Sequence, residues 1–132
     1  MKNLSRTLII TVVLFIANSS VFAQNNYPPE IECSKEVTYK EVDNVKLNLW
    51  IFNPPKHSLT DKTPAIVFFF GGGWSAGSPT QFVKHCEYLS ARGMVAIVAD
   101  YRVKSRNNVV AKTCVSDAKS AVRWIREHAE EL

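Results

Sequence analysis

The amino-acid sequence predicts an α/β fold in which a β-hairpin precedes alternating strands and helices. Two segments, residues 64–70 and 94–99, are apolar at every position, which is typical of strands that are covered on both faces of a parallel sheet. A helical pattern follows each of them, and alternating apolar and polar residues precede them. This order favours a parallel sheet with right-handed crossover connections.

The first 23 residues have the pattern of an export signal. Lys2 and Arg6 give a positive start, residues 8–17 are uncharged, and residues 21–23 end in alanine, as a signal peptidase requires. The apolar run is short for a hydrocarbon layer of about 30 Å. We therefore expect residues 1–23 to be removed, and the mature protein to be secreted or periplasmic without a membrane anchor. Residues 24–36 are then an N-terminal arm, and residues 37–132 the folded domain.

Charge and cysteine content exclude some classes of function. The formal net charge is +4, and removal of the signal leaves 14 Lys and Arg against 12 Asp and Glu. Because these cations are scattered, we expect no nucleic-acid partner. There is no C-x-x-C pair and no histidine at metal-binding spacing, so we expect no metal and no cofactor. Cys86 and Cys114 are expected to be buried thiols; a disulfide is the alternative.

The hairpin is predicted by two β-like runs on either side of Asp43-Asn44. The first run includes Val37 and Tyr39, and the second covers residues 45–52. Residues 53–55, Asn-Pro-Pro, end the second run, since proline cannot continue a ladder of backbone hydrogen bonds.

Two helices are expected after the two apolar strands. The first covers residues 79–92, with Ser78 as N-cap, Pro79 in the first turn and Gly93 at the end. Its apolar side contains Phe82, Val83, Cys86, Leu89 and Tyr88. The second is a long amphipathic helix, which continues to residue 132. Its apolar face contains Cys114, Ala118, Ala121, Ile125 and Leu132, with Val115 and Val122 beside it. The polar segment 104–108 is expected to be a loop.

Three consecutive glycines, Gly71, Gly72 and Gly73, follow the strand at 64–70. Glycines at a strand end cost conformational entropy, which suggests that a bare backbone is needed there. Backbone N–H groups can hold a phosphate or an oxyanion. The segment is a poor match to G-x-x-x-x-G-K-[ST] and to G-x-G-x-x-G, so nucleotide binding is the weaker hypothesis. A tight turn without a ligand is a further alternative.

Residues 65–78, 98–102 and 117–126 resemble the N-terminal half of α/β-hydrolase esterases. They are similar in particular to a secreted bacterial branch with carbohydrate esterases that remove acetyl or feruloyl groups. The resemblance covers residues 45–132 and implies hydrolysis of a small-molecule or carbohydrate ester without a cofactor. It implies that Gly72 and Gly73 donate their N–H groups to the oxyanion and that Gly71 sets the turn. The histidine of the family's H-G-G-G loop is Phe70 here.

Two further residues are candidate substrate contacts. Trp74 either lines an acyl or sugar site or packs over the loop. Asp100 follows the second apolar strand, at the edge of the sheet where ligands gather in α/β folds. The alternative for Asp100 is that it caps its own loop.

Ser75 is a weaker candidate for the nucleophile. Residues 73–77 match the G-x-S-x-G elbow, and Asp100, Asp117 and His128 follow in the order acid, acid, histidine. In an elbow, however, the helix begins at once, whereas Ser78-Pro79 places it later. The resemblance instead implies that the serine, acid and histidine lie beyond residue 132. We therefore expect residues 1–132 to be inactive on their own and to leave an open edge beside residues 64–70. A non-enzymatic exported binding module is the contrasting hypothesis.

Overall fold

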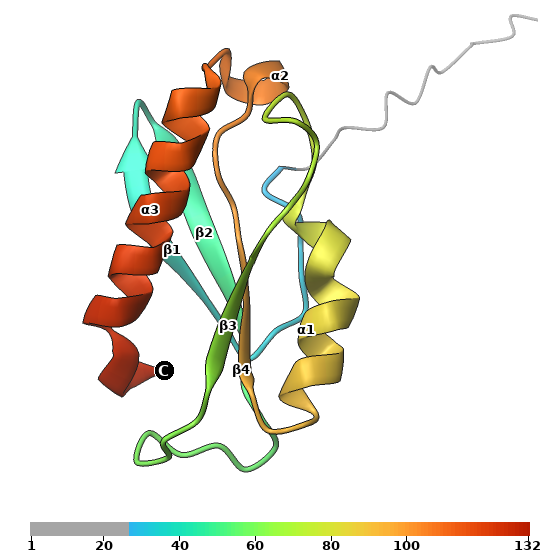
Figure 1. Cartoon of the computed structure of the whole chain (residues 1–132), viewed down its shortest axis with the longest axis vertical. Coiled ribbons are helices and arrows are strands. Elements are labelled where there is room, and N and C mark those ends of the chain that lie inside the picture. The colour runs from blue at the N-terminus through green and yellow to red at the C-terminus, as the bar shows by residue number, and fades with distance from the viewer. Residues whose placement is uncertain (1–26) are drawn as a thin grey trace, which may run out of the picture.

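A four-stranded mixed sheet lies between two helices in the computed structural model, which describes residues 27–132 (Figure 1). The predicted signal segment and the first residues of the arm lie outside the described residues. The strands are β1 Lys35–Val42, β2 Val45–Phe52, β3 Ala65–Phe69 and β4 Val95–Ala99. The helices are α1 Val83–Ser90, α2 Lys104–Asn107 and α3 Ala111–Glu127, with 3-10 turns η1 Pro79–Phe82 and η2 Ala129–Glu131. The predicted α/β fold and the order of its main elements are confirmed.

The sheet has the strand order β1-β2-β4-β3. β1 and β2 form the predicted antiparallel hairpin, and β2 also pairs antiparallel with β4. β3 and β4 are parallel and are joined through α1. Asp43 and Asn44, where the sequence predicts the hairpin turn, have φ values of 52° and 62°, which fit a type I′ turn.

Alternate residues of β2 and β4 fill two cores, one on each face of the sheet. The core on the α3 side includes Leu49, Ile51 and Ile97, and the core on the α1 side includes Trp50 and Val98. Figure 1 shows α1 and α3 on opposite faces. β4 is buried at every position, as predicted for a strand covered on both faces.

β3 differs from this expectation. Its residues are exposed or only half buried, although all five are apolar. Among residues 27–132, β4 is the strand that pairs with β3, so the other edge of β3 carries no ladder. The expectation that both faces of this strand are covered is therefore wrong for residues 27–132, whereas the expected open edge beside residues 64–70 is confirmed.

The helices also differ in detail from the prediction. The segment 79–92 begins as η1 and becomes α1 only at Val83, while one turn of helix, α2, occupies the predicted polar loop. Tyr88 is exposed, with the Arg92 guanidinium over its ring, so it does not belong to the apolar side. Val115 is exposed as well, and α3 ends at Glu127 rather than at residue 132. No helix within residues 27–132 is long and apolar enough to cross a membrane.

Candidate functional site

The loop of residues 71–77 leaves the carboxyl end of β3 in a tight curl. Ser75 N–H and Ala76 N–H both donate to the carbonyl oxygen of Gly72, at 3.0 and 3.3 Å. Gly72 has φ 138°, and a Cβ atom there would lie 2.1 Å from Ala76 O. Only glycine fits this position without moving the backbone. Gly73 and Trp74 both have φ 60°, in the left-handed region.

Two adjacent backbone donors in this loop are available to a ligand. No described residue accepts a hydrogen bond from the N–H groups of Gly72 or Gly73, and both residues are exposed. By contrast, Gly71 N–H donates to Gln81 Oε1 at 2.6 Å. Gly71 is thus tied to the following turn, while its two neighbours present free donors of the kind that stabilise an oxyanion.

The segment that follows β4 binds backbone carbonyl groups of the loop and of Phe70, just before it. Tyr101 Oη donates to Phe70 O at 2.5 Å, and the rings of these residues stack at 4.1 Å. Lys104 N–H donates to Trp74 O at 3.1 Å, and Ser105 N–H donates to Ser75 O at 2.9 Å. Phe70, at the histidine position of the H-G-G-G pattern, is therefore a buried packing residue. Sequence reasoning missed these contacts, for which the polar character of residues 104–108 is the one local signal.

Asp100 lies inside the protein, with 1% of its surface exposed. Its Oδ1 atom accepts from Tyr101 N–H at 2.7 Å, from Arg106 Nη2 at 3.2 Å and from Tyr27 Oη. Its Oδ2 atom is buried and has no partner among the described residues. Burial raises the Asp100 pKa to about 6, against the opposing effects of Tyr27 and Arg106. The bond to Tyr101 N–H is the loop-capping role that the sequence left open as the alternative to substrate contact.

Asp117 is part of a separate buried ion cluster. It is 0% exposed, accepts from Arg102 Nε at 2.8 Å and Nη2 at 3.0 Å, and pairs with Lys40 Nζ at 2.6 Å. Burial favours a higher pKa, but the bonds from Arg102 and Lys40 outweigh it and hold the Asp117 pKa below its usual value. Asp117 thus joins α3 to the hairpin. Sequence reasoning missed Lys40 and Arg102 as its partners.

Ser75 is not joined to a histidine. Its Oγ atom contacts the carbonyl oxygen of Gly73 at 3.4 Å. His128 follows the last residue of α3 and stacks on Trp124, whereas the loop with Ser75 lies near the first residue of α3 (Figure 1). The 17 residues of α3 span about 25 Å, so the helix separates the histidine from the serine. His85 packs on the rings of two phenylalanines, and His57 contacts Leu132 O. The predicted sequence order of Ser75, Asp117 and His128 is therefore not a spatial triad within residues 27–132.

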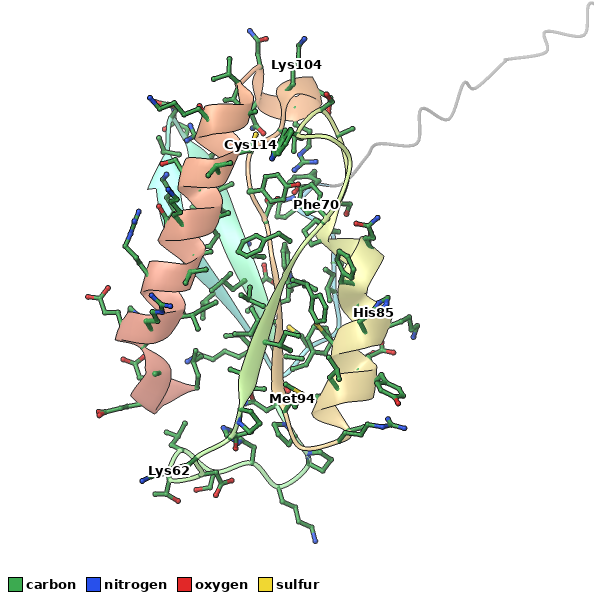
Figure 2. All side chains as sticks on the ribbon, viewed as in Figure 1. Lys62, Phe70, His85, Met94, Lys104 and Cys114 are labelled. Atoms are coloured by element: carbon green, nitrogen blue, oxygen red, sulfur yellow. The ribbon has the colours of Figure 1, made fainter. Side chains whose placement is uncertain are left out.

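A pocket of about 470 Å³ opens beside the glycine loop and the free edge of β3. Phe70, Trp74, Tyr101 and Cys114 form one end of it. Apolar and cationic side chains of α3, together with Phe69, line the rest. Trp74 is 52% exposed, so its ring is available to a ligand. Figure 2 shows Phe70 and Cys114 at the same end of the molecule, opposite Met94.

Cys86 and Cys114 are buried free thiols, as expected. No group of His, Cys, Asp or Glu among residues 27–132 could hold a metal ion.

Comparison with protein families and curated sequences gives matches over most of the chain. The model of the BD-FAE family matches residues 49–132. Carboxylesterase NlhH of Mycobacterium tuberculosis is 32% identical over 84 residues, which cover 62% of this chain and 25% of that protein. The 2-hydroxyisoflavanone dehydratase of Glycine max is 27% identical over 123 residues, or 90% of this chain and 37% of that protein.

Solved structures of an esterase from the planctomycete Thermogutta terrifontis, Est2, are similar in both sequence and fold. The propionate-bound structure is 57% identical with a TM-score of 0.77, and it covers 80% of this chain and 39% of that one. The butyrate-bound structure has the same identity and TM-score and covers 38% of that chain. This chain therefore spans about two fifths of the length of the esterase that it matches.

Proposed function

The chain belongs to the BD-FAE family and has the fold of α/β-hydrolase esterases, and on this basis we propose that the intact protein hydrolyses carboxylic esters. The observation that carries the proposal is the pair of free N–H groups of Gly72 and Gly73 at the carboxyl end of β3. They lie beside an aromatic pocket that is open to solvent.

The glycine loop is proposed to act as the oxyanion hole. When a nucleophile attacks the ester carbonyl, negative charge develops on the carbonyl oxygen, and two fixed donors stabilise it. Removing one such donor typically costs about 2.7–4 kcal/mol of transition-state stabilisation. The curl around Gly72 O fixes the loop before the charge develops, so little reorganisation is needed during the reaction.

The nucleophile, its histidine and the acid are proposed to lie outside residues 1–132. A serine would attack the ester, the histidine would take its proton and pass it to the leaving alcohol, and water would then hydrolyse the acyl-enzyme. The open edge of β3 supports this proposal, because a further strand beside it would cover the half-buried residues of β3.

Esters with short acyl groups are the proposed substrates. The Thermogutta terrifontis esterase has been solved with propionate and with butyrate bound. The exposed ring of Trp74 lies near the proposed oxyanion hole and offers a surface on which a small acyl group or a sugar ring can pack, while Phe70 and Tyr101 form the wall behind it. Acetylated carbohydrates are therefore the first substrates to test. Feruloylated carbohydrates, whose acyl group is larger, are the comparison.

Export is proposed together with this activity, with cleavage after Ala23. N-terminal sequencing of the protein recovered outside the cytoplasm should begin at Gln24. Recovery of Met1 at that N-terminus contradicts the proposal.

The test is labelling of the intact protein with paraoxon, which phosphorylates the Thermogutta terrifontis esterase. We expect one phosphoryl group per molecule, loss of p-nitrophenyl butyrate hydrolysis, and a labelled serine outside residues 1–132. The Ser75→Ala variant should react as the wild type does. A label on Ser75 would establish the elbow alternative instead, and neither label nor hydrolysis would favour a binding module.

A further inference from the structure

Arg106, on α2, connects three parts of the protein that are far apart in the sequence. Its Nη1 atom donates to the carbonyl oxygen of Gly77, at the end of the glycine loop, at 2.5 Å. Its Nη2 atom lies 3.1 Å from Tyr101 O, 3.2 Å from Asp100 Oδ1 and 2.7 Å from Tyr27 Oη in the N-terminal arm. The guanidinium also lies over the Tyr27 ring, 3.9 Å from its centroid.

The contact at Gly77 lies where the glycine loop closes on itself. Gly77 has φ 121°, and a Cβ atom there would lie 2.4 Å from Gly71 O and 2.6 Å from the Phe70 ring. The two ends of the loop are therefore in direct contact. A donor that fixes Gly77 O also fixes the base of the curl that presents Gly72 and Gly73.

Different side chains hold the two ends of the loop. Gln81 binds the N–H of Gly71, and Tyr101 binds the carbonyl of Phe70, both at the start of the loop. Among the described residues, Arg106 is the side chain that binds the end of the loop at Gly77. Loss of Arg106 thus leaves the start of the loop attached and its end without a side-chain donor.

We propose that Arg106 is a positioning residue for the oxyanion loop, and that Asp100 and the arm residue Tyr27 orient its guanidinium. This inference rests on the proposed esterase function and adds the N-terminal arm to the residues on which the site depends. Arg106 does not touch the reacting atoms; it acts through the backbone at Gly77. The planar guanidinium donates toward several acceptors at fixed angles, which an ammonium group cannot reproduce.

The first measurement is the amide exchange of Ser75 and Ala76 in the intact protein, followed by nuclear magnetic resonance. Both amides donate to Gly72 O and so report the curl itself. A hydrogen bond from a charged donor contributes enough that its loss should speed exchange at these two amides about tenfold in Arg106→Met. Arg106→Lys should lie between Arg106→Met and the wild type. The matched control is Arg92→Met, which removes an exposed guanidinium from the far end of α1.

The second measurement is kcat for p-nitrophenyl butyrate, counted per site that paraoxon labels, so that unfolded protein does not contribute. Because the oxyanion forms only in the transition state, Arg106→Met should lower kcat at least about tenfold and leave KM within about twofold. Tyr27→Phe removes one partner of Arg106 and should lower kcat by a smaller factor. Arg92→Met should behave as the wild type.

The two measurements separate the two proposals. Unchanged exchange at Ser75 and Ala76 in Arg106→Met overturns the positioning role, whatever the activity. Faster exchange with an unchanged kcat per labelled site overturns it as well. If the wild-type protein hydrolyses no ester, the proposed function fails, while amide exchange still decides whether Arg106 fixes the loop.

Discussion

Replacing Gly72 by alanine tests the glycine loop most directly. The new methyl group would lie 2.1 Å from Ala76 O and 2.8 Å from Ala76 C, which are backbone atoms that cannot rotate away. The φ value of 138° is also one that residues with a Cβ atom seldom adopt. The loop must therefore change its path, and the N–H group of Gly72 must turn with it.

The expected loss follows from the donor that is displaced. Loss of one oxyanion donor lowers kcat by about 10²–10³, or about 2.7–4 kcal/mol. Because the oxyanion forms only in the transition state, KM should change little. We therefore expect Gly72→Ala to lower kcat and kcat/KM by the same factor.

The assay is hydrolysis of p-nitrophenyl butyrate by the intact protein, with thermal unfolding of each variant measured in parallel. Gly73→Ala is the near comparison, since its φ is 60° and no atom lies within 4 Å of the added methyl group. Gly73→Ala should lower the free energy of unfolding by about 1–2 kcal/mol, the cost of a left-handed backbone for a residue with a Cβ atom, and should lose less activity than Gly72→Ala. Gly93→Ala is the distant control, with φ 90° and open space, and should lower stability without changing kcat.

A Gly72→Ala variant that keeps kcat within about threefold of the wild type would refute the assignment of the oxyanion hole to this loop. Equal losses of kcat in the Gly72 and Gly93 variants would refute it too, because general destabilisation would then explain both.

Three further predictions concern stability. Asp117→Asn leaves the half-buried Lys40 and Arg102 without their shared counter-charge and should lower the free energy of unfolding by about 3 kcal/mol. Asp43→Asn, whose side chain is 84% exposed, should cost less than about 1 kcal/mol, and similar losses for the two variants in chemical denaturation would contradict this. Burial raises the Asp100 pKa to about 6, so the folded state holds this proton more tightly than the unfolded state. The unfolding free energy of the wild type should therefore fall relative to that of Asp100→Asn by about 2 kcal/mol as pH rises from about 4 to about 6. A difference that stays constant over this pH range would contradict the prediction. Residues 24–132 produced alone should self-associate through the open edge of β3, and a monomer that unfolds cooperatively in sedimentation and calorimetry would be evidence against this.

Local chemistry made part of the structure predictable. Asp43-Asn44 predicted a tight hairpin turn because these residues tolerate positive φ, and the structure has them there. The apolar run 94–99 predicted a strand buried on both faces, and β4 is one. The same apolar pattern did not predict the half-exposed faces of β3, because a strand is covered only by neighbours that are present; the open edge expected beside residues 64–70 is there.

The candidate site divides in the same way. The sequence determined the element order, the hairpin, the glycine loop and the bare backbone that this loop presents, because each depends on residues within a few positions of one another. Only the tertiary structure decided which side chains fix that loop and which carboxylates are already bound by cationic side chains. The bonds of Arg106 to Gly77, of Tyr27 to Asp100 and of Lys40 to Asp117 join residues 29, 73 and 77 positions apart. Such pairs form only after the sheet brings its loops together, and no local pattern encodes them.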